Sequence, residues 1–329
     1  MTEEAIAMLD SLDVKMGGDG GMLALNLVLA FVMFGVAIGI KPKTFLDIIK
    51  DPKSIILGVV CQIILLPALT FLLTITFKDW LPPMISLGMI LVASCPGGNV
   101  SNFVTQLSRG NTELSVALTA FNTVACVITT PLNFSFWGNM YLRFAEKRDL
   151  VLPTLEIPFT EIFVTIFLIL GIPLVLGILC SQYLPKVAQA LKKPMQYLSI
   201  AFFIGMVLIA FGGNFGVFMK CIQYIFLIVL VHNLLALGIG FGTSTLFKLP
   251  YKDRRTLTIE TGIQNSGLGL ALLLNPYIFN PEIWRDGFTG LPINGGMMII
   301  AAWWGVWHIV SGLSLAMIWR IRGRKEVNE

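Results

Sequence analysis

The residue whose position is most informative about chemistry is Glu260. It is the only one of the 19 acidic residues that lies deep within a long apolar stretch. An ionised carboxylate in the middle of a membrane costs about 2.5–3.5 kcal/mol on insertion scales, so it needs a partner. No lysine or arginine lies at a comparable depth, and a bound cation is therefore the compensation that we expect. The alternative is a protonated carboxyl group that is hydrogen-bonded to a neighbouring helix.

Oxygen-bearing side chains accompany Glu260 in the apolar stretches. They carry hydroxyl or amide groups and are Ser101, Asn102, Thr105, Ser115, Thr119, Thr261, Gln264, Asn265 and Ser266. Small alkali cations prefer hydroxyl, amide and carbonyl oxygens, and unwound backbone supplies further carbonyls. Ser115 and Thr119 have the spacing that puts two side chains on one face of a helix. These residue types predict a site for an alkali cation.

The composition indicates that these residues lie in a membrane. Hydrophobic residues make up 56% of the 329 positions and charged residues only 13%, and the mean hydropathy is +0.81. A soluble domain carries about 25% charged residues. We therefore exclude a soluble globular protein and a disordered chain. We also exclude a nucleic-acid-binding protein, because the basic residues behind the net charge of +4 lie in short clusters between apolar runs. Five scattered cysteines and two histidines predict neither a disulfide framework nor a zinc site.

Apolar stretches long enough to cross a bilayer recur along the chain. A membrane helix needs about 20 mostly apolar residues. We predict nine spans, at 22–40, 54–77, 84–107, 112–136, 159–182, 196–218, 221–247, 253–275 and 296–319. The connections on one side then carry 16 lysines and arginines and those on the other side 7, which places the N-terminus outside and the C-terminus in the cytoplasm. Residues 1–21 are expected to form an extracellular or periplasmic leader and 320–329 a cytoplasmic tail.

Two of the predicted spans are interrupted by residues that do not favour a helix. The third span contains the run 94–102, with Pro96, Gly97 and Gly98, and the eighth contains the run 260–267, with Gly262 and Gly267. Proline removes a helical hydrogen bond and glycine weakens a helix. Unwound backbone inside a membrane survives only where it is packed in protein or lines a polar cavity. Paired interruptions of this kind point to the binding site of a transporter.

The surroundings of the two interruptions are similar and predict an internal repeat. The interruptions lie about 165 residues apart, and the suspected repeats are 22–136 and 196–319, each with four spans. The connector 137–195 holds the fifth span, which places the halves in opposite orientations, an inverted repeat. Within it, the charged and aromatic segment 137–158 is expected to lie at the membrane interface. The predicted fold is an all-α polytopic membrane protein with nine transmembrane helices and two broken crossing helices.

Two long motifs resemble the bile acid:sodium symporter family. The first combines Cys95-Pro96-Gly97-Gly98, Ser101-Asn102, Arg109-Gly110-Asn111 and the run 114–119. The second is the run 257–268, Leu257-Thr258-Ile259-Glu260-Thr261-Gly262-Ile263-Gln264-Asn265-Ser266-Gly267-Leu268. Shorter matches are Met33-Phe34-Gly35, Gln62 ahead of Pro67, His232-Asn233, and Trp307-His308. The resemblance covers roughly residues 27–320 and is weakest across 137–195.

This resemblance implies both an architecture and a set of site residues. The core domain would comprise spans two to four and seven to nine, and the panel domain spans one, five and six. Two sodium ions are implied. The residues of the first sodium site would be Ser101, Asn102, Ser115, Thr119 and Glu260. Those of the second would be Gln62, Glu260 and Gln264, with the backbone carbonyls of Thr261 and Ile263. Substrate would bind near Asn99, Val100, Asn265 and Ser266, with His308 as a further contact.

The expected function is secondary active transport, in which the symport of sodium drives uptake of an organic anion by alternating access. The anion would be a bile acid or a smaller carboxylate, and the setting a bacterial inner or plasma membrane. Alternatives are a sodium-independent anion carrier, a binding-only sensor of the same fold and a gated pore. No pairing of serine or cysteine with histidine is legible, so we expect neither an enzyme nor an organic cofactor. The oligomeric state stays open, and a monomer is compatible with the sequence.

Overall fold

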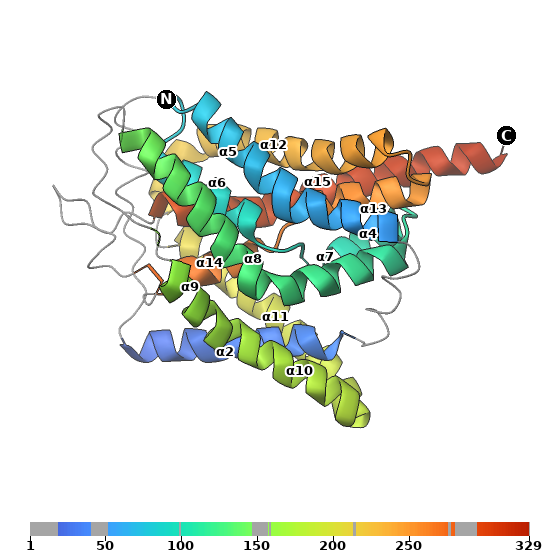
Figure 1. Ribbon diagram of the computed structural model, residues 1–329, viewed down its shortest axis with the longest axis horizontal. Helices are drawn as coiled ribbons and strands as arrows, with labels where there is room; N and C mark the ends of the chain where they lie inside the picture. Colours follow the sequence, from blue (N-terminus) through green and yellow to red (C-terminus); the bar gives the residue numbers. More distant parts are fainter. Residues whose placement is uncertain are drawn as a thin grey trace.

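The computed structural model describes residues 19–40, 52–98, 100–146, 157, 159–212, 215–275, 278–279 and 295–328. Within these ranges every regular element is helical and there is no strand (Figure 1). The elements are α2 (Asp19–Ile38), α4 (Pro52–Val60), η1 (Cys61–Leu65), α5 (Leu66–Thr76), α6 (Pro83–Ser94), α7 (Val100–Leu107), α8 (Thr112–Glu146), α9 (Phe159–Ile166), η2 (Phe167–Gly171), α10 (Ile172–Tyr183), α11 (Pro185–Gly212), α12 (Phe215–Leu246), α13 (Tyr251–Gly262), α14 (Ser266–Leu273) and α15 (Gly295–Asn328). The predicted all-α class is confirmed for the described residues.

Four of the described helical segments are long and apolar enough to cross a membrane. They are Pro52–Thr76, Thr112–Phe144, Tyr224–Leu246 and Gly295–Ile321, with mean hydropathies between 1.5 and 2.6. Each exceeds the length that spans the hydrocarbon core of a bilayer. They agree with the predicted membrane protein. The count of nine spans and the inverted repeat stay predictions, since shorter or interrupted helices occupy most of the other predicted spans.

Two helices are longer than the sequence predicts. α8 continues ten residues beyond position 136 and ends at Glu146, where an interfacial segment was expected. Tyr141 and Leu142 are buried in this stretch, so tertiary packing extends the helix despite its charged neighbours. α11 begins at Pro185, 11 residues before the predicted sixth span, and runs through Pro194. Proline is well tolerated in a first turn, and an internal proline removes only one bond of a long helix.

A proline follows each of the two π-helical turns, η1 and η2. Pro67 is the second residue of α5, which follows η1, and Pro173 is the second residue of α10, which follows η2. Because proline has no N–H and its ring meets the carbonyl four residues earlier, the preceding turn widens. Gln62 lies in η1 and is buried. The wide turn therefore places a long polar side chain in the interior of the molecule.

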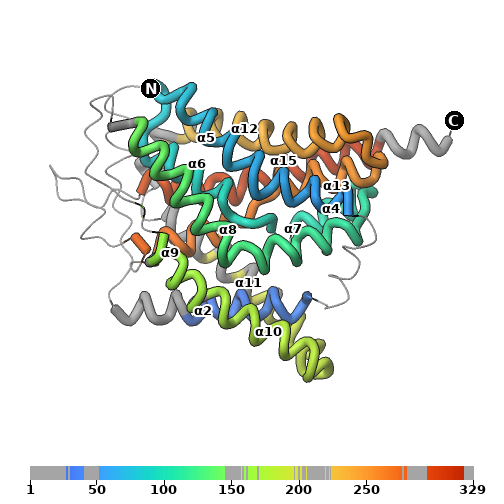
Figure 2. Tube along the Cα trace, in the orientation of Figure 1, coloured from blue at the N-terminus to red at the C-terminus, as the bar shows by residue number. Residues whose placement is uncertain are grey.

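The helices form two groups that are visible in Figures 1 and 2. α2, α10 and α11 pack against one another in the lower part of the view. The larger group contains α4 to α8 and α12 to α15. α9 and η2, which lead into α10, extend the smaller group. The groups touch where α9 and η2 pack on α8 and where α11 packs on α12, α14 and α15. Both interrupted helices belong to the larger group, which therefore positions the candidate site.

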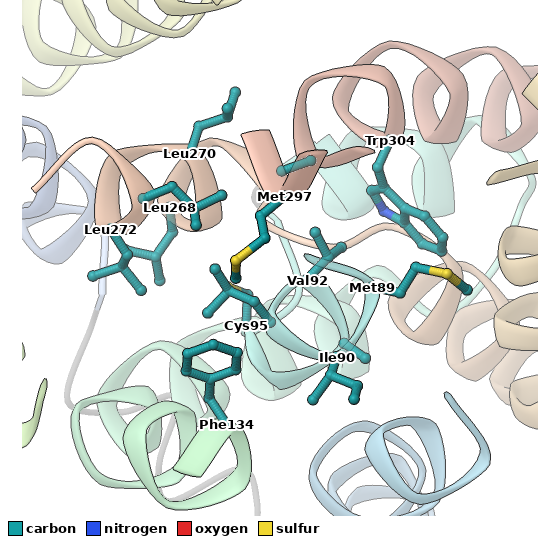
Figure 3. Packing of buried hydrophobic residues seen from close by; sticks show 14 of the residues in the cluster. Met89, Ile90, Val92, Cys95, Phe134, Leu268, Leu270, Leu272, Met297 and Trp304 are labelled. Carbon is teal, nitrogen blue, oxygen red and sulfur yellow. The ribbon is translucent and has the colours of Figure 1, made fainter. Parts of the chain in front are cut away.

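An apolar core holds the interrupted helices in place (Figure 3). Cys95, directly after α6, belongs to one buried cluster with Leu268 and Leu272 of α14, Met297 of α15 and Phe134 of α8. None of these side chains is more than 5% exposed. Burying a large apolar side chain contributes about 1.5–3 kcal/mol. The halves that flank the two breaks, α6 and α14, are thus anchored against the continuous helices α8 and α15.

Candidate functional site

The two helix breaks meet in the middle of the larger helix group. Gly97, between α6 and α7, forms an antiparallel bridge with Gln264, between α13 and α14. The Gly98 N–H donates to the Ile263 carbonyl at 3.0 Å, and the Asn265 N–H donates to the Pro96 carbonyl at 2.8 Å. Backbone groups inside a membrane need internal partners. Each break therefore satisfies the backbone groups that the other leaves unpaired.

Glycine at position 97 allows the backbone to approach the site closely. A Cβ atom at this position would lie 3.2 Å from Glu260 Oε2 and 3.5 Å from the Glu260 carbonyl oxygen. At position 98 it would lie 3.3 Å from the Gln264 carbonyl oxygen. The distances of 3.2 and 3.3 Å are tighter than ordinary van der Waals contact, so a side chain at either position would require its neighbour to shift by a few tenths of an ångström. The glycine pair therefore lets the two breaks approach without displacing Glu260 or the backbone of Gln264.

Glu260 lies in the last turn of α13 and is 3% exposed. Its Oε1 atom accepts hydrogen bonds from the hydroxyl groups of Ser101 on α7, at 2.6 Å, and Ser115 on α8. The Thr119 hydroxyl, also on α8, lies 3.1 Å from Oε2 and 3.3 Å from Oε1. Within the described residues these three hydroxyls are the polar partners of the carboxyl group, and no ion pair to it is found. Two helices, α7 and α8, thus bring neutral oxygen atoms to a buried acid on a third.

Asn102 completes this set of oxygen atoms. Its Oδ1 atom accepts from the Ser115 hydroxyl at 2.9 Å and from the Thr119 hydroxyl at 3.3 Å. The five residues of the first predicted sodium site therefore lie together. Each hydroxyl group has one proton but several oxygen neighbours, so lone pairs remain for another ligand.

The chemistry of this set suits a hard cation. Hydroxyl, amide and carboxylate oxygens are the ligands that alkali and alkaline-earth cations prefer, whereas thiolate and imidazole suit transition metals. No group of three or more His, Cys, Asp or Glu residues that could hold a metal is present in the described part of the chain. Glu260 is the one carboxylate among the five side chains, and its single negative charge would balance the single positive charge of an alkali cation.

At the second predicted sodium site, the side-chain amides of Gln62 and Gln264 hydrogen-bond to each other. Gln62 Nε2 donates to Gln264 Oε1 at 2.5 Å, and Gln264 Nε2 lies 3.2 Å from Gln62 Oε1. Gln62 Nε2 also reaches the Cys95 carbonyl at 3.2 Å, and Gln264 Nε2 donates to the Thr261 carbonyl at 2.8 Å. The Ile263 carbonyl accepts from Gly98. Among the described contacts, none joins Glu260 to Gln62, so this set is assembled only in part.

The predicted substrate residues are distributed around the crossing. Val100 begins α7 and is 40% exposed, whereas Asn265 caps α14 by accepting from the Leu268 N–H at 3.1 Å. Ser266 is the buried first residue of α14. His308 Nδ1 donates to the Trp304 carbonyl of its own helix at 2.7 Å. Asn99 lies outside the described residues. No described hydrogen bond joins His308 to Asn265 or Ser266.

Asn233 is a residue to which the sequence assigned no role. Its Nδ2 atom donates to the carbonyl of Gly262, the last residue of α13, at 2.8 Å. Its neighbour His232 lies 2.8 Å from the Thr70 hydroxyl, and the His232 ring packs on Trp304 at a centroid distance of 4.5 Å. The sequence marked this pair in two ways, as polar residues in an otherwise apolar span and as a short match to the symporter family. Asn233 satisfies a carbonyl that the break in α13 leaves without a helical partner.

The fold and the site together define a class of protein. Two interrupted helices cross inside an all-helical membrane protein, around a buried carboxylate among oxygen ligands, which is an architecture of secondary transporters. The chain belongs to the sodium bile acid symporter family, whose model matches residues 26–221. This range includes the first interruption, and the second lies beyond it.

Three relatives are similar over most of this chain. The uncharacterized sodium-dependent transporter YocS of Bacillus subtilis (strain 168) is 29% identical over 302 residues, which cover 92% of this chain and 84% of the relative. The human P3 protein is 30% identical over 266 residues, 80% of this chain and 53% of the relative, so the chain spans about half its length. The human ileal sodium/bile acid cotransporter is 28% identical over 269 residues, 80% of this chain and 72% of the relative.

Proposed function

We propose that this chain is a symporter that couples the inward movement of Na⁺ to the uptake of an organic anion. Family membership supports this function, as do two relatives whose names describe sodium-dependent transport. The observation that carries the proposal is the convergence of three hydroxyl groups on the buried Glu260. A carboxylate at membrane depth with only oxygen neighbours needs a positive charge, which a sodium ion supplies.

The first sodium ion would be held by the Glu260 carboxylate, the Asn102 carbonyl oxygen and the three hydroxyl groups of Ser101, Ser115 and Thr119. To coordinate a cation, each hydroxyl turns a lone pair toward it and gives its proton to another acceptor. Ser115 has such an acceptor in Thr105 Oγ1, at 3.3 Å. The Ser115 hydroxyl therefore has an alternative arrangement that leaves its lone pairs free for an ion.

The second sodium ion would lie at the glutamine pair. Gln62 and Gln264 now direct their amide groups at each other and at the carbonyls of Cys95 and Thr261. Coordination requires the two amide oxygens to face the ion instead. Binding of the second ion would then exchange an amide–amide contact for ion coordination, with the carbonyls of Thr261 and Ile263 as further ligands. Because these groups flank the helix break, the ion would stiffen the crossing.

The substrate anion would bind beside the crossing, near Asn99, Val100, Asn265 and Ser266. The N-termini of α7 and α14 lie at the crossing, and helix N-termini favour negative charge. His308 would act differently. Its Nδ1–H is engaged by a carbonyl, so in the neutral ring Nε2 carries a lone pair. His308 would therefore accept a hydrogen bond from a hydroxyl group of the substrate, which favours a hydroxylated anion.

Transport would proceed by movement of one helix group against the other. α2, the run from α9 through η2 to α10, and α11 would form the panel and the larger group the core, consistent with nine spans in two inverted repeats. The contacts of α8 with α9 and of α11 with α15 would be the surfaces that slide. If two Na⁺ ions accompany one monoanion, one net charge moves inward, and about 2.3 kcal/mol per 100 mV drives each cycle.

Uptake into proteoliposomes tests this function. A panel of one bile acid and several short hydroxycarboxylates would be presented with an inward gradient of Na⁺ or of K⁺. We expect saturable uptake of at least one anion in Na⁺ only. Glu260→Gln should abolish the sodium dependence, because it removes the charge that balances the ion. The exposed Glu113→Gln on α8 is the matched control and should transport normally.

Two results would contradict the proposal. One is equal uptake in Na⁺ and in K⁺ by the wild-type protein. The other is a Glu260→Gln variant with the same sodium dependence as the wild type, which would make Glu260 a protonated, structural side chain.

A further inference from the structure

A second polar contact joins α8 and α13, two of the three helices that carry the proposed first sodium site. Asn111 precedes Ser115 by four residues at the start of α8, and Thr256 precedes Glu260 by four residues on α13. The Asn111 N–H donates to the Thr256 hydroxyl at 2.8 Å. α8 and α13 therefore run in the same direction side by side, with one contact at 111 and 256 and the next at Ser115 and Glu260.

The Thr256 hydroxyl both accepts and donates hydrogen bonds. The single hydroxyl proton of Thr256 lies between two carbonyl acceptors, that of Lys252 at 3.0 Å and that of Asn111 at 3.1 Å. The Asn111 N–H also lies 3.3 Å from the Lys252 carbonyl. Gly110 makes this approach possible, because a Cβ atom there would be 3.0 Å from Thr256 Oγ1. Thr256 is fully buried.

Asp253 extends this contact to a third helix. Its Oδ1 atom accepts from Asn111 Nδ2 at 2.9 Å, and its Oδ2 atom accepts from the Ser54 hydroxyl of α4 at 2.8 Å. Asn111 Oδ1 in turn accepts from the Leu114 N–H at 3.1 Å and caps α8. We call Asn111, Asp253 and Thr256 the polar bracket.

The same turn of α13 also holds the end of α7, which carries Ser101. Arg255 donates from Nη1 to the Ser108 carbonyl, directly after α7, at 2.8 Å. Its guanidinium lies over the rings of Tyr251 and Trp319, at 4.5 and 5.7 Å from their centroids. Residues 253–256 are therefore linked to every element that supplies a ligand to the first site.

We propose that the polar bracket sets the axial register of α8 against α13 and so positions Ser115 and Thr119 at Glu260; this inference rests on the proposed sodium site. Apolar packing between helices has little directionality, whereas hydrogen bonds fix one alignment. The bracket lies about 6 Å along each helix from the site, at about 1.5 Å per residue. A slip of one residue would shift and rotate the hydroxyl groups enough to lose the contacts with Glu260. Asn111, Asp253 and Thr256 are positioning residues and are not ion ligands.

The test uses the full-length protein in detergent, with Na⁺ alone as the probe. The unfolding temperature is measured while K⁺ is replaced by Na⁺ at constant ionic strength, because an ion that binds the folded state raises it. The unfolding temperature in K⁺ measures how much a substitution destabilises the fold. The half-saturating Na⁺ concentration, which gives half of the full temperature rise, measures the affinity of the site for Na⁺. Thr256→Val should raise that concentration about tenfold, as expected for a misaligned set of ligands. Thr256→Ser keeps the hydroxyl and should remain within about twofold of the wild type.

Thr258→Val is the matched control. Thr258 is also buried on the same helix, but within the described residues its hydroxyl bonds only to the Arg254 carbonyl of α13, at 2.7 Å. It should leave the half-saturating Na⁺ concentration unchanged. Should Thr256→Val fail to fold, Thr256→Ala removes the same hydroxyl without adding a methyl group. Glu260→Gln, measured alongside, should remove the response to Na⁺ altogether.

The outcomes separate the bracket from the sodium site. If Glu260→Gln loses the Na⁺ response while Thr256→Val titrates like Thr258→Val, the positioning role is wrong and the site stands. If the wild type does not distinguish Na⁺ from K⁺, or if Glu260→Gln titrates normally, the proposed site fails and the bracket with it. A tenfold change in Thr256→Val together with rescue by Thr256→Ser supports the inference.

Discussion

Ser101 on α7 donates a 2.6 Å hydrogen bond to Glu260 on α13, although 159 positions separate the two residues. α7 is the second half of one interrupted helix, and α13 is the first half of the other. Each break sets the direction of the half-helix next to it. If the helix continued without a break through 94–102 or through 260–267, one half-helix would point in another direction and Ser101 would not reach Glu260. The contact therefore depends on both breaks, and the breaks depend on the backbone bridge between Gly97 and Gln264.

The close approach at Gly97 predicts that Gly97→Ala weakens sodium binding. The added methyl group would press on Glu260 Oε2 from 3.2 Å, and the bridge to Gln264 prevents the backbone from retreating. We expect a loss of about 1–3 kcal/mol in the free energy of unfolding, typical of overpacking, and a higher half-saturating Na⁺ concentration. Thermal unfolding during a Na⁺ titration measures both quantities.

Gly242→Ala on α12 is the control for this substitution. A Cβ atom at Gly242 would meet no atom within 4 Å, and alanine favours a helix over glycine by about 0.5–1 kcal/mol. This variant should be as stable as the wild type or slightly more stable, with an unchanged Na⁺ titration. Equal behaviour of the two variants would show that the crossing tolerates a side chain at position 97.

The glutamine pair predicts that Gln62→Leu removes one of two sodium ions. The substitution leaves an apolar side chain that is one atom shorter and deletes the oxygen that would face the second ion. With two coupled ions the Hill coefficient for Na⁺ in uptake should fall from about 2 toward about 1. Initial uptake rates against Na⁺ concentration measure it, with an anion that the wild type transports. Gln106→Leu, at an exposed position of α7, is the control, and an unchanged coefficient in Gln62→Leu would exclude the second site.

The contact of Asn233 with the end of α13 predicts a loss of stability in Asn233→Leu. The Gly262 carbonyl would lose its donor, and a buried acceptor without a partner costs about 1–3 kcal/mol. The unfolding temperature should fall in K⁺ as well as in Na⁺, because this contact supports the helix break and not an ion. Among the described residues the Oδ1 atoms of both Asn233 and the buried Asn122 lack a partner, so the bond to Gly262 is what distinguishes Asn233. Asn122→Leu breaks no described hydrogen bond and should be neutral or stabilising. The opposite order of the two variants would refute this account of Asn233.

Several features of this protein could be predicted from short stretches of sequence. Hydropathy over about 20 residues is enough for the membrane class, and proline with glycine is enough for the interruptions after Ser94 and after Gly262. Glu260 stood out because a charge in an apolar span is costly wherever its partners lie. The extent of α8 was harder to predict, because the charged residues that ended it in the prediction are outweighed by the packing of the buried Tyr141 and Leu142.

Contacts between distant residues required the tertiary structure. The Gln62–Gln264 pair spans 202 positions, the Asn111–Thr256 contact 145, and the Asn233 contact with Gly262 joins separate helices. The residue types at these positions were visible, but hydroxyl and amide groups in apolar helices usually bond within their own turn, as Thr258 does. Whether such a group instead bonds to another helix depends on how the helices pack and at what relative height. That alignment arises from the whole core, and no local pattern encodes it.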